Sequence, residues 1–429
     1  MRRTPLVGGL IAGLALTLVA CGSSSTTKTT TTTGTLAGRG PITFATGKDL
    51  SGNMQHQVDV WNAAHPSEKV TITELPADAD GQRQQMIQNA TTKSDAYTIL
   101  NLDVVWTSEF AAHQWLAQLP QSQFDLSGFL KPTISTGQYR GKLYAIPSAS
   151  DGGLLYYRKD LMDKAGITTP PATWAEMFAD CDKLKKLPEA ATAGCYAGQL
   201  DKYEGLTVNA SEAINGAGGV VVDDSGKPNV NTPAAKAGLD VLVQAVQKGY
   251  IPKAALTYKE EDGRLAFQAG KLLFHRQWPY QYSLANKTDG SSKVAGKFAV
   301  APLPGLSGPG ASTLGGHDLA ISAFAKNKAT AADFIKYFTG EATQRANLIA
   351  TSQAPTIASL YDDPALVKQF PYLTALKASI LNAKSRPLVV QYGDVTAAIQ
   401  EAAYAAIAGT KTTDQALTDL QTKLSALIK

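Results

Sequence analysis

Alternating and periodic apolar positions along the chain predict strands that alternate with helices. The stretch "GPITFATG" (Gly40 to Gly47) alternates like a strand, and the segment after it places Met54, Val58 and Trp61 at helical spacing. A second strand, "KVTITELP", follows. The segment "AYTILNLDVVWTSEFAAHQWLAQL" then predicts a buried strand, a loop and a helix that begins near Thr107. This succession of strands and helices is typical of an α/β protein.

Later helices are marked by their ends as well as by their period. Thr173 and Glu176 in "TWAEMFADC" have the spacing of a capping box, and so do Thr412 and Gln415 at the start of the last segment. The segment "AAKAGLDVLVQAVQKG" has an apolar face and Gly249 at its end, as a helix that stops at a glycine would have. These signals place one helix after Thr173, one that ends at Gly249 and one after Thr412.

The N-terminal residues follow another pattern. Arg2 and Arg3 precede an apolar run from Leu6 to Ala20 that, at about 15 residues, is shorter than a membrane span and is typical of a signal peptide. The letters "LVAC" that end at Cys21 resemble a bacterial lipobox, in which cleavage before the cysteine is followed by lipidation of its thiol. We therefore expect residues 1–20 to be a lipoprotein signal peptide and Cys21 to be lipidated. An ordinary cleaved signal with an incidental cysteine is the alternative.

The residues that follow Cys21 are almost all Ser, Thr and Gly, a composition that buries little and forms a flexible tether. A tether over residues 21–40 would reach roughly 25 Å. It would hold the mature protein at the outer face of the cytoplasmic membrane, outside the cytoplasm.

Length and charge narrow the class of the mature protein. About 390 residues follow the tether, which suits two lobes better than one core. The whole chain has 40 basic and 36 acidic residues, and loss of Arg2 and Arg3 leaves 38 against 36, a formal charge of +2. A nucleic-acid-binding protein would carry a strongly basic face, so we expect no nucleic-acid partner.

The other two cysteines, Cys181 and Cys195, lie 14 residues apart. Because an exported protein folds where disulfides persist, we expect a disulfide between them, with two free thiols as the alternative. No histidine lies nearby and there is no C-x-x-C pair, so no metal site is expected.

The sequence carries none of the catalytic motifs that we sought. It has no G-x-S-x-G, no H-E-x-x-H and no complete phosphate-binding loop, and its five histidines are isolated. We expect that the protein needs no cofactor and is not an enzyme. A glycosidase needs only two carboxylates at a suitable distance, so that class stays open as an alternative, with Asp103 and Glu260 as the pair.

Several segments together resemble the extracellular solute-binding proteins of sugar ABC importers. These are "KLYAIPSASDGGLLYYRKDLMDKAG", "TWAEM", "EEDGRLAFQAGKLLFHRQWPYQY", "FAVAPLPG" and "AADFIKYFTGEATQRAN", in the order and spacing of that family. Within the family, "LDVVWTSEFAAHQWL" and the dipeptide Arg386–Pro387 are most similar to the actinobacterial trehalose- and maltose-binding branch. The family commonly has Tyr-Asn where this chain has Tyr156-Tyr157.

The resemblance implies a two-lobe, periplasmic-binding-protein-like (type II) α/β fold with hinge crossovers and a ligand cleft between the lobes. The expected N-terminal lobe is residues 41–148 plus 301–342, and the expected C-terminal lobe is 149–300 plus 343–429. The crossovers are expected near 148–153, 300–303 and 340–344.

A sugar offers hydroxyl groups and apolar ring faces, so its site needs charged acceptors and aromatic planes. Asp103 directly follows a buried strand, at the end where α/β sheets bind ligands, although it could instead cap the helix near Thr107. The resemblance implies that Trp278 stacks on the sugar and that Glu260 accepts hydrogen bonds. Tyr280 is a further candidate, and Glu261 is the alternate to Glu260.

Four further candidates are Asp151, Gly315, Gly316 and Arg386, of which the first three lie in or just after an expected crossover. Asp151 lies in the first crossover, where the resembling branch has an amide, so the identity of the sugar is open. Gly315 and Gly316 follow the second, where backbone can approach a ligand, although a plain turn would also explain them. Arg386 resembles a sugar-contacting arginine of the branch, and a salt bridge across the second lobe is its alternative role.

The sequence therefore predicts a lipid-anchored, monomeric binding protein that delivers an α-linked disaccharide, of the trehalose or maltose type, to ABC permease subunits. A different sugar or a polyol is the nearest variant. The secreted glycosidase and a structural envelope lipoprotein are the rivals from other classes.

Overall fold

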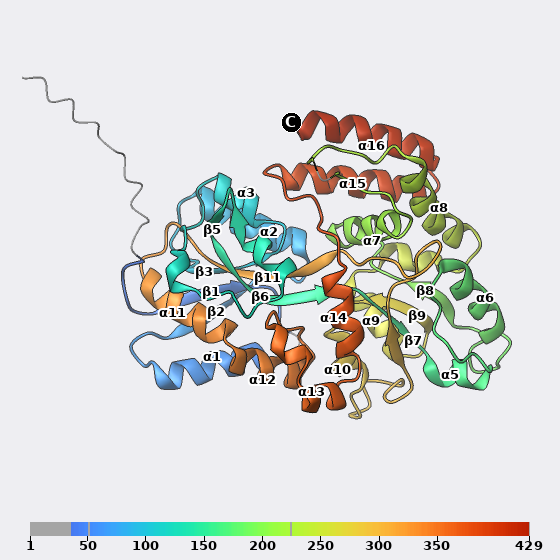
Figure 1. The fold of residues 1–429 in the computed structure, drawn as a ribbon, viewed down its shortest axis with the longest axis horizontal. Coiled ribbons are helices and arrows are strands. Elements are labelled where there is room, and N and C mark those ends of the chain that lie inside the picture. The colour runs from blue at the N-terminus through green and yellow to red at the C-terminus, as the bar shows by residue number, and fades with distance from the viewer. Residues whose placement is uncertain (1–35, 50–51, 224, 429) are drawn as a thin grey trace, which may run out of the picture. The chain divides into compact units, whose positions relative to one another are not determined.

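The computed structural model describes residues 36–49, 52–223 and 225–428 (Figure 1). The predicted signal peptide, Cys21 and most of the predicted tether lie outside the described residues. Among the described helices, none has the length and apolar character that a membrane span requires.

The first lobe is built on a five-stranded sheet with the order β2-β1-β3-β11-β6. Its strands are β1 (Ile42–Thr46), β2 (Val70–Glu74), β3 (Ile99–Asp103), β6 (Ala145–Gly152) and β11 (Leu314–Ile321). The first three run parallel, whereas β11 is antiparallel to both β3 and β6. The strand–helix succession predicted for this part of the chain is confirmed.

The second lobe is built on a four-stranded sheet with the order β10-β7-β9-β8. Its strands are β7 (Leu154–Tyr157), β8 (Gly194–Ala197), β9 (Leu272–Gln277) and β10 (Ala299–Ala301). Strand β9 lies between β7, to which it is antiparallel, and β8, to which it is parallel. A separate hairpin joins β4 (Gln138–Tyr139) and β5 (Lys142–Leu143).

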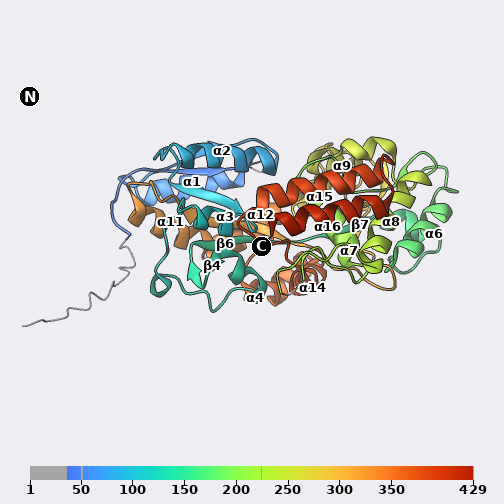
Figure 2. The same ribbon diagram turned by 90° about the horizontal axis from the view of Figure 1, so that it is seen from above.

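Helices cover both sheets (Figures 1 and 2). In the first half of the chain they are α1 (Asn53–Ala64), α2 (Ala79–Thr91), α3 (Thr107–Ala112), α4 (Lys131–Ile134), α5 (Lys159–Lys164), α6 (Trp174–Leu184) and α7 (Glu204–Asn215). In the second half they are α8 (Pro233–Gln247), α9 (Glu260–Gln268), α10 (Gln281–Ala285), α11 (Lys328–Thr339), α12 (Glu341–Thr351), α13 (Pro364–Gln369), α14 (Leu373–Leu381), α15 (Tyr392–Ile407) and α16 (Thr413–Leu427). Single 3-10 turns lie at Gln121–Gln123, Ser135–Gly137, Lys253–Thr257 and Ala358–Tyr361.

The chain passes between the two sheets at two of the expected places. Gly153 alone separates β6 from β7, and residues 302–313 connect β10 to β11. We call these two segments crossover 1 (Gly152–Gly153) and crossover 2 (302–313). Crossover 1 falls inside the expected range 148–153, whereas crossover 2 begins within the expected range 300–303 and extends ten residues beyond it.

The third expected crossover, at residues 340–344, leads into a helix that contacts both lobes. Residues 340–344 join α11 to α12, and α12 packs against α1 of the first lobe and α10 of the second. The chain reaches the helices of the second lobe through residues 382–391, after which α15 packs against α7 and α8. The hydroxyl of Ser283 in α10 also donates to the oxygen of Thr351 at the end of α12, at 2.9 Å.

Local signals read from the sequence recur in the structure. Both predicted capping boxes are present, the first at Thr173 and the second at Thr412. Gly249 follows α8 with φ of +76°, a conformation that glycine adopts without strain. Cys181 in α6 and Cys195 in β8 form a disulfide with their Cα atoms 5.6 Å apart.

Both lobes have cores of interlocking aromatic and aliphatic side chains. In the first lobe Phe44 of β1 makes edge-to-face contacts with Phe334 and Phe338 of α11. In the second, Phe267 of α9 packs edge-to-face against Tyr156 of β7. These cores fix the ends of the strands, at which the candidate site lies.

Candidate ligand-binding site

Three strands of the first sheet end side by side and present the first group of candidate residues. In the strand register, Asp103 of β3 pairs with His317 of β11, and Gly315 of β11 pairs with Asp151 of β6. Asp103, Asp151 and Gly315 therefore lie along one edge of the first sheet, beside crossover 1. The sequence predicted each of them separately, and the register brings them together.

The second lobe contributes Trp278, which directly follows β9. A Cβ atom placed on Gly315 would lie 2.8 Å from the Cη2 and Cζ3 atoms of Trp278 and 3.2 Å from the Cβ of Asp151. The indole thus reaches across to the first sheet and touches the backbone of β11. Only a residue without a side chain at position 315 allows this approach.

One face of the Trp278 ring is covered by a guanidinium group. The Cζ atom of Arg276 lies 3.7 Å from the centroid of the ring, a close cation–π contact. Arg276 is itself 1% exposed and is held by two hydrogen bonds to Glu212, at 2.6 and 2.8 Å. The indole plane is therefore fixed by a buried ion pair.

Asp103 does not cap the neighbouring helix. Its Oδ1 atom accepts a hydrogen bond from the Val105 nitrogen at 3.2 Å, whereas α3 begins without a side-chain cap. Arg386 donates to the same carboxylate, with Nη2 2.7 Å from Oδ1. The alternative role of Asp103 as a helix cap is thus not what the structure shows.

Arg386 joins the two lobes. Besides Asp103 of the first lobe, it donates to Glu204 at the start of α7 in the second lobe, and its side chain is 1% exposed. Tyr392 and Thr396 of α15 also donate to Glu204. Burial raises the pKa of Glu204, while the Arg386 charge lowers it. Arg386 therefore forms the salt bridge that the sequence left open as its alternative role, although this bridge spans both lobes.

The environment of Asp151 disfavours its charged form. Burial raises the pKa of Asp151 to about 7; the positive charge of Arg276 opposes this shift, and the negative charge of Asp103 adds to it. Near neutral pH the carboxyl group is therefore divided between a form that only accepts hydrogen bonds and a form that also donates one.

Glu260 and Glu261, at the start of α9, are in different surroundings. The Glu261 carboxylate accepts hydrogen bonds from Arg264 and from the Tyr280 hydroxyl, the latter at 2.7 Å. Glu260 forms no ion pair among the described residues, and burial raises its pKa. Beside it, the hydroxyl of Tyr203 is buried and lacks a well-formed hydrogen bond. Of the two carboxylates, Glu260 has more capacity left for a ligand.

Gly316 allows strands β11 and β6 to pair closely. It has φ of +120°, and a Cβ atom there would lie 2.2 Å from the carbonyl oxygen of Ala149 in β6. Its lack of a side chain is thus explained by the close pairing of β11 with β6, without a ligand. For Gly315, by contrast, the neighbour that needs the space is Trp278.

A cavity of about 490 Å³ lies between the lobes, on the side of Glu204. Helix α2 of the first lobe forms one wall, and α15 with the start of α7 forms the other. Its lining combines amide and charged groups with one hydroxyl: Asp80, Arg83, Gln84, Ile87, Gln88, Glu204, Gly393, Thr396, Ala397 and Gln400. Such a lining suits a polar ligand better than an apolar one, but it includes neither Trp278 nor Asp103.

Contacts at the rim bring the lobes together beside this cavity. The carboxylate of Asp78, the N-cap residue of α2, lies 3.9 Å from the ammonium group of Lys259, which is the residue before α9. Farther along α2, a Cβ atom on Gly393 of α15 would lie 2.3 Å from the Arg83 guanidinium. The structure is therefore a form in which the lobes touch.

Arg276, Glu204 and Tyr203 were not identified from the sequence. A charged residue in the apolar strand "KLLFHRQW" was a signal for Arg276, because a buried charge in a strand needs a partner. Glu204 gave no such signal, since an acidic residue in the first turn of a helix is common. Within the described part of the chain, no group of three or more metal-binding side chains is present.

Comparison with known proteins places these features in a wider context. The family model described as bacterial extracellular solute-binding protein matches residues 47–345. A probable ABC transporter-binding protein of Deinococcus radiodurans is 34% identical over 378 residues, which cover 86% of this chain and 89% of the relative. A mannitol-binding protein of Pseudomonas aeruginosa is 26% identical over 297 residues, 67% of this chain and 66% of the relative.

Among solved structures, a maltose-bound MalE3 of T. maritima superposes with a TM-score of 0.85. It is 32% identical, and the match covers 90% of this chain and 99% of that chain. The two-lobe α/β fold expected from the sequence is thereby confirmed.

Proposed function

Because the chain belongs to the bacterial extracellular solute-binding protein family, we propose that it captures an α-linked disaccharide, of the trehalose or maltose type, for an ABC importer. The matching family and the similar proteins are solute-binding proteins, so the chain is a binding protein that acts outside the cytoplasm and not an enzyme. The disaccharide is the proposed part of this assignment.

The observation that carries the proposal is the meeting of Trp278 with the carboxylate edge of the first sheet. An indole ring packs well against the apolar face of a sugar, and carboxylates are strong acceptors for its hydroxyl groups. Here the ring lies against Gly315 and beside Asp151, with Asp103 in the adjacent strand. The proposed ligand contacts are Asp103, Asp151, Glu260 and Trp278, supported by Gly315.

Two other predicted contacts take an indirect role in this proposal. Arg386 orients Asp103, and Tyr280 orients Glu261, because each donates a hydrogen bond to that neighbouring carboxylate. Gly316 keeps β11 and β6 together and is left out of the proposed contacts.

The choice of a disaccharide rests on likeness. The solved neighbour from T. maritima, which is 32% identical, is maltose-bound. The mannitol-binding relative favours a second candidate, a linear polyol. A polyol would use the same carboxylates but would present no ring face to Trp278.

The remaining parts of the proposal concern attachment and partners. We propose that Cys21 carries the lipid anchor, that the protein is a monomer, and that its partners are the permease subunits of an ABC importer. Neither a cofactor nor nucleic acid enters this account.

A thermal-shift screen across trehalose, maltose, lactose and mannitol tests the proposal. Ligand that binds only the native state raises the midpoint of unfolding, so the bound sugar is identified by its shift. We expect a shift with an α-linked disaccharide that Trp278→Ala and Asp103→Ala both reduce. Chromatography of the incubated sugar tests the glycosidase alternative, in which free glucose would accumulate.

A further inference from the structure

A buried carboxylate, Glu212 of α7, lies at the meeting point of the two crossovers. Its oxygens accept hydrogen bonds from Arg276, from the Ser312 hydroxyl at 3.2 Å, and from the nitrogen of Thr313 at 3.1 Å. The hydroxyl of Thr313 donates to it as well, at 3.2 Å. Ser312 and Thr313 are the last residues of crossover 2, so Glu212 holds the end of that segment.

The same cluster holds crossover 1. The nitrogen of Gly153 donates to the Ser312 hydroxyl at 2.6 Å. A Cβ atom on Gly153 would lie 2.7 Å from Nη2 of Arg276 and 2.9 Å from Oε1 of Glu212. The backbone of crossover 1 therefore lies directly against the Glu212–Arg276 pair, at a distance that excludes any side chain.

The cluster also reaches the proposed ligand site. The Nε and Nη2 groups of Arg276 donate hydrogen bonds to Glu212, while the guanidinium plane covers the ring of Trp278. From Gly153 to the indole the path is continuous: backbone nitrogen, Ser312 hydroxyl, Glu212 carboxylate, Arg276 guanidinium and Trp278 ring. Each step is a direct contact between buried or half-buried groups.

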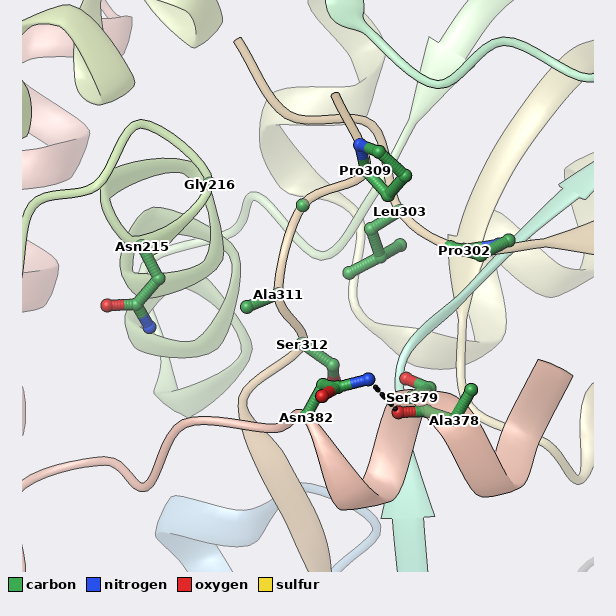
Figure 3. A pocket seen from close by; sticks show the side chains of 11 residues that line it. Asn215, Gly216, Pro302, Leu303, Pro309, Ala311, Ser312, Ala378, Ser379 and Asn382 are labelled. Carbon is green, nitrogen blue, oxygen red and sulfur yellow. Dashed lines mark hydrogen bonds between the residues drawn. The ribbon is translucent and has the colours of Figure 1, made fainter. Parts of the chain in front are cut away.

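Crossover 2 has space on its other side. A cavity of about 290 Å³ lies there. Figure 3 shows residues that line it: Pro302, Leu303, Pro309, Ala311 and Ser312 of this crossover, Asn215 and Gly216 at the end of α7, and Ala378, Ser379 and Asn382 around the end of α14. A segment that borders a cavity can shift with less repacking than one enclosed by side chains. The polar attachments of the end of crossover 2 are the carboxylate of Glu212 and the backbone of Lys384, whose nitrogen donates to the Ser312 oxygen at 2.8 Å.

We propose that Glu212 is a positioning residue that couples the occupancy of Trp278 to closure of the lobes. This inference rests on the proposed function. Sugar stacked on the face of the indole opposite Arg276 fixes Trp278 and Arg276, and Arg276 fixes the two crossovers through Glu212. Movement of the crossovers away from the closed arrangement displaces Arg276 from the indole and weakens the sugar contact.

The thermodynamic consequence is a single linked equilibrium. A ligand shifts the equilibrium between two conformations only by the difference between its affinities for them. A protein in which the link is broken therefore binds the sugar more weakly and closes less completely. Removing the link should therefore lower affinity and contraction together, without removing any group that touches the sugar.

Two variants break the link at different points. Glu212→Gln removes the charge that holds Arg276. Ser312→Ala removes the hydroxyl that lies between Gly153 and Glu212 and is also within 2.6 Å of the Thr313 oxygen. The matched control is Ser379→Ala, because the Ser379 hydroxyl donates to the Gly153 oxygen at 3.0 Å but does not contact Glu212. Small-angle X-ray scattering gives the radius of gyration with and without maltose, and calorimetric titration gives the affinity for maltose.

We expect wild type and Ser379→Ala to contract on addition of maltose. Ser312→Ala, the milder variant should Glu212→Gln fail to fold, is expected to bind maltose about tenfold more weakly and to contract less at saturation. Equal contraction and affinity within twofold of wild type in a folded Ser312→Ala protein would overturn the inference alone. Wild-type protein that binds maltose without contracting would overturn it too, whereas a wild type that binds no sugar would overturn the proposed function itself and the inference with it.

Discussion

Arg386 and Asp103 form an ion pair that links the two lobes, in which Nη2 of Arg386 lies 2.7 Å from Oδ1 of Asp103. Asp103 is fixed at the end of β3, and Arg386 is fixed from the other side by Glu204 of α7. A single guanidinium therefore compensates two carboxylates from different lobes, and Asp103 keeps one orientation in the closed arrangement.

Replacing Arg386 by Gln is expected to destabilise the protein. Removal of one partner leaves Glu204 with 5% exposure and Asp103 with 15% exposure uncompensated, and breaking such buried ion pairs typically costs about 3–5 kcal/mol. Urea denaturation followed by circular dichroism measures the loss. The control is Arg39→Gln, since Arg39 also pairs with two carboxylates, Glu68 and Asp333, but is 58% exposed. An Arg386→Gln midpoint as high as that of the control would contradict the role assigned to the bridge.

Stability should fall as pH rises from about 4 to about 7. The pKa of Asp151 is about 7 in the folded protein, against an ordinary value of 3.8, because burial disfavours the charge. Between these values the folded state holds a proton that the unfolded state has released, so rising pH favours unfolding. The free energy of unfolding of wild type should therefore decline across this window relative to that of Asp151→Asn, which has no group to titrate there. Parallel pH profiles for the two proteins would show that Asp151 does not have this raised pKa.

Gly315→Ala should weaken sugar binding without unfolding the first lobe. The added Cβ atom would lie 2.8 Å from two ring atoms of Trp278, so the indole must move away from the sheet. We expect at least a tenfold loss of maltose affinity, about 1.4 kcal/mol, in calorimetric titration. The matched control is Gly308→Ala in crossover 2, where a Cβ atom meets nothing within 4 Å. Equal affinity in the two variants would mean that the position of the indole does not matter for the sugar.

Removing the disulfide should affect stability and leave binding intact. Cys181 and Cys195 close a loop with a sequence separation of 14 in the second lobe, and a loop of this size contributes about 3 kcal/mol. The double variant Cys181→Ser, Cys195→Ser should therefore unfold at lower urea concentration with unchanged maltose affinity. A changed affinity would indicate that the disulfide shapes the cleft.

The features that could be predicted from the sequence are those decided within a few residues or by one repeating pattern. The capping boxes at Thr173 and Thr412 and the helix end at Gly249 each depend on neighbours along the chain. The alternation of strands and helices needed only the apolar period. Asp103 was found as a candidate because strand ends bind ligands in α/β folds.

The features that could not be predicted depend on residues far apart in the chain. Arg386 lies 182 positions from Glu204, and Arg276 lies 64 positions from Glu212. Whether a buried charge contacts a ligand or another charge depends on the fold that brings these partners together. For the same reason Gly316 was interpreted as a ligand neighbour, although its close partner is the Ala149 carbonyl of the next strand.

The most direct test of the account is a crystal structure of the protein grown with the disaccharide that gives the largest thermal shift. The account predicts one intact sugar between the lobes, with a ring against the face of Trp278 opposite Arg276 and hydroxyl groups on Asp103 and Asp151. A sugar bound elsewhere, with Trp278 and Asp103 both free of it, would contradict the account.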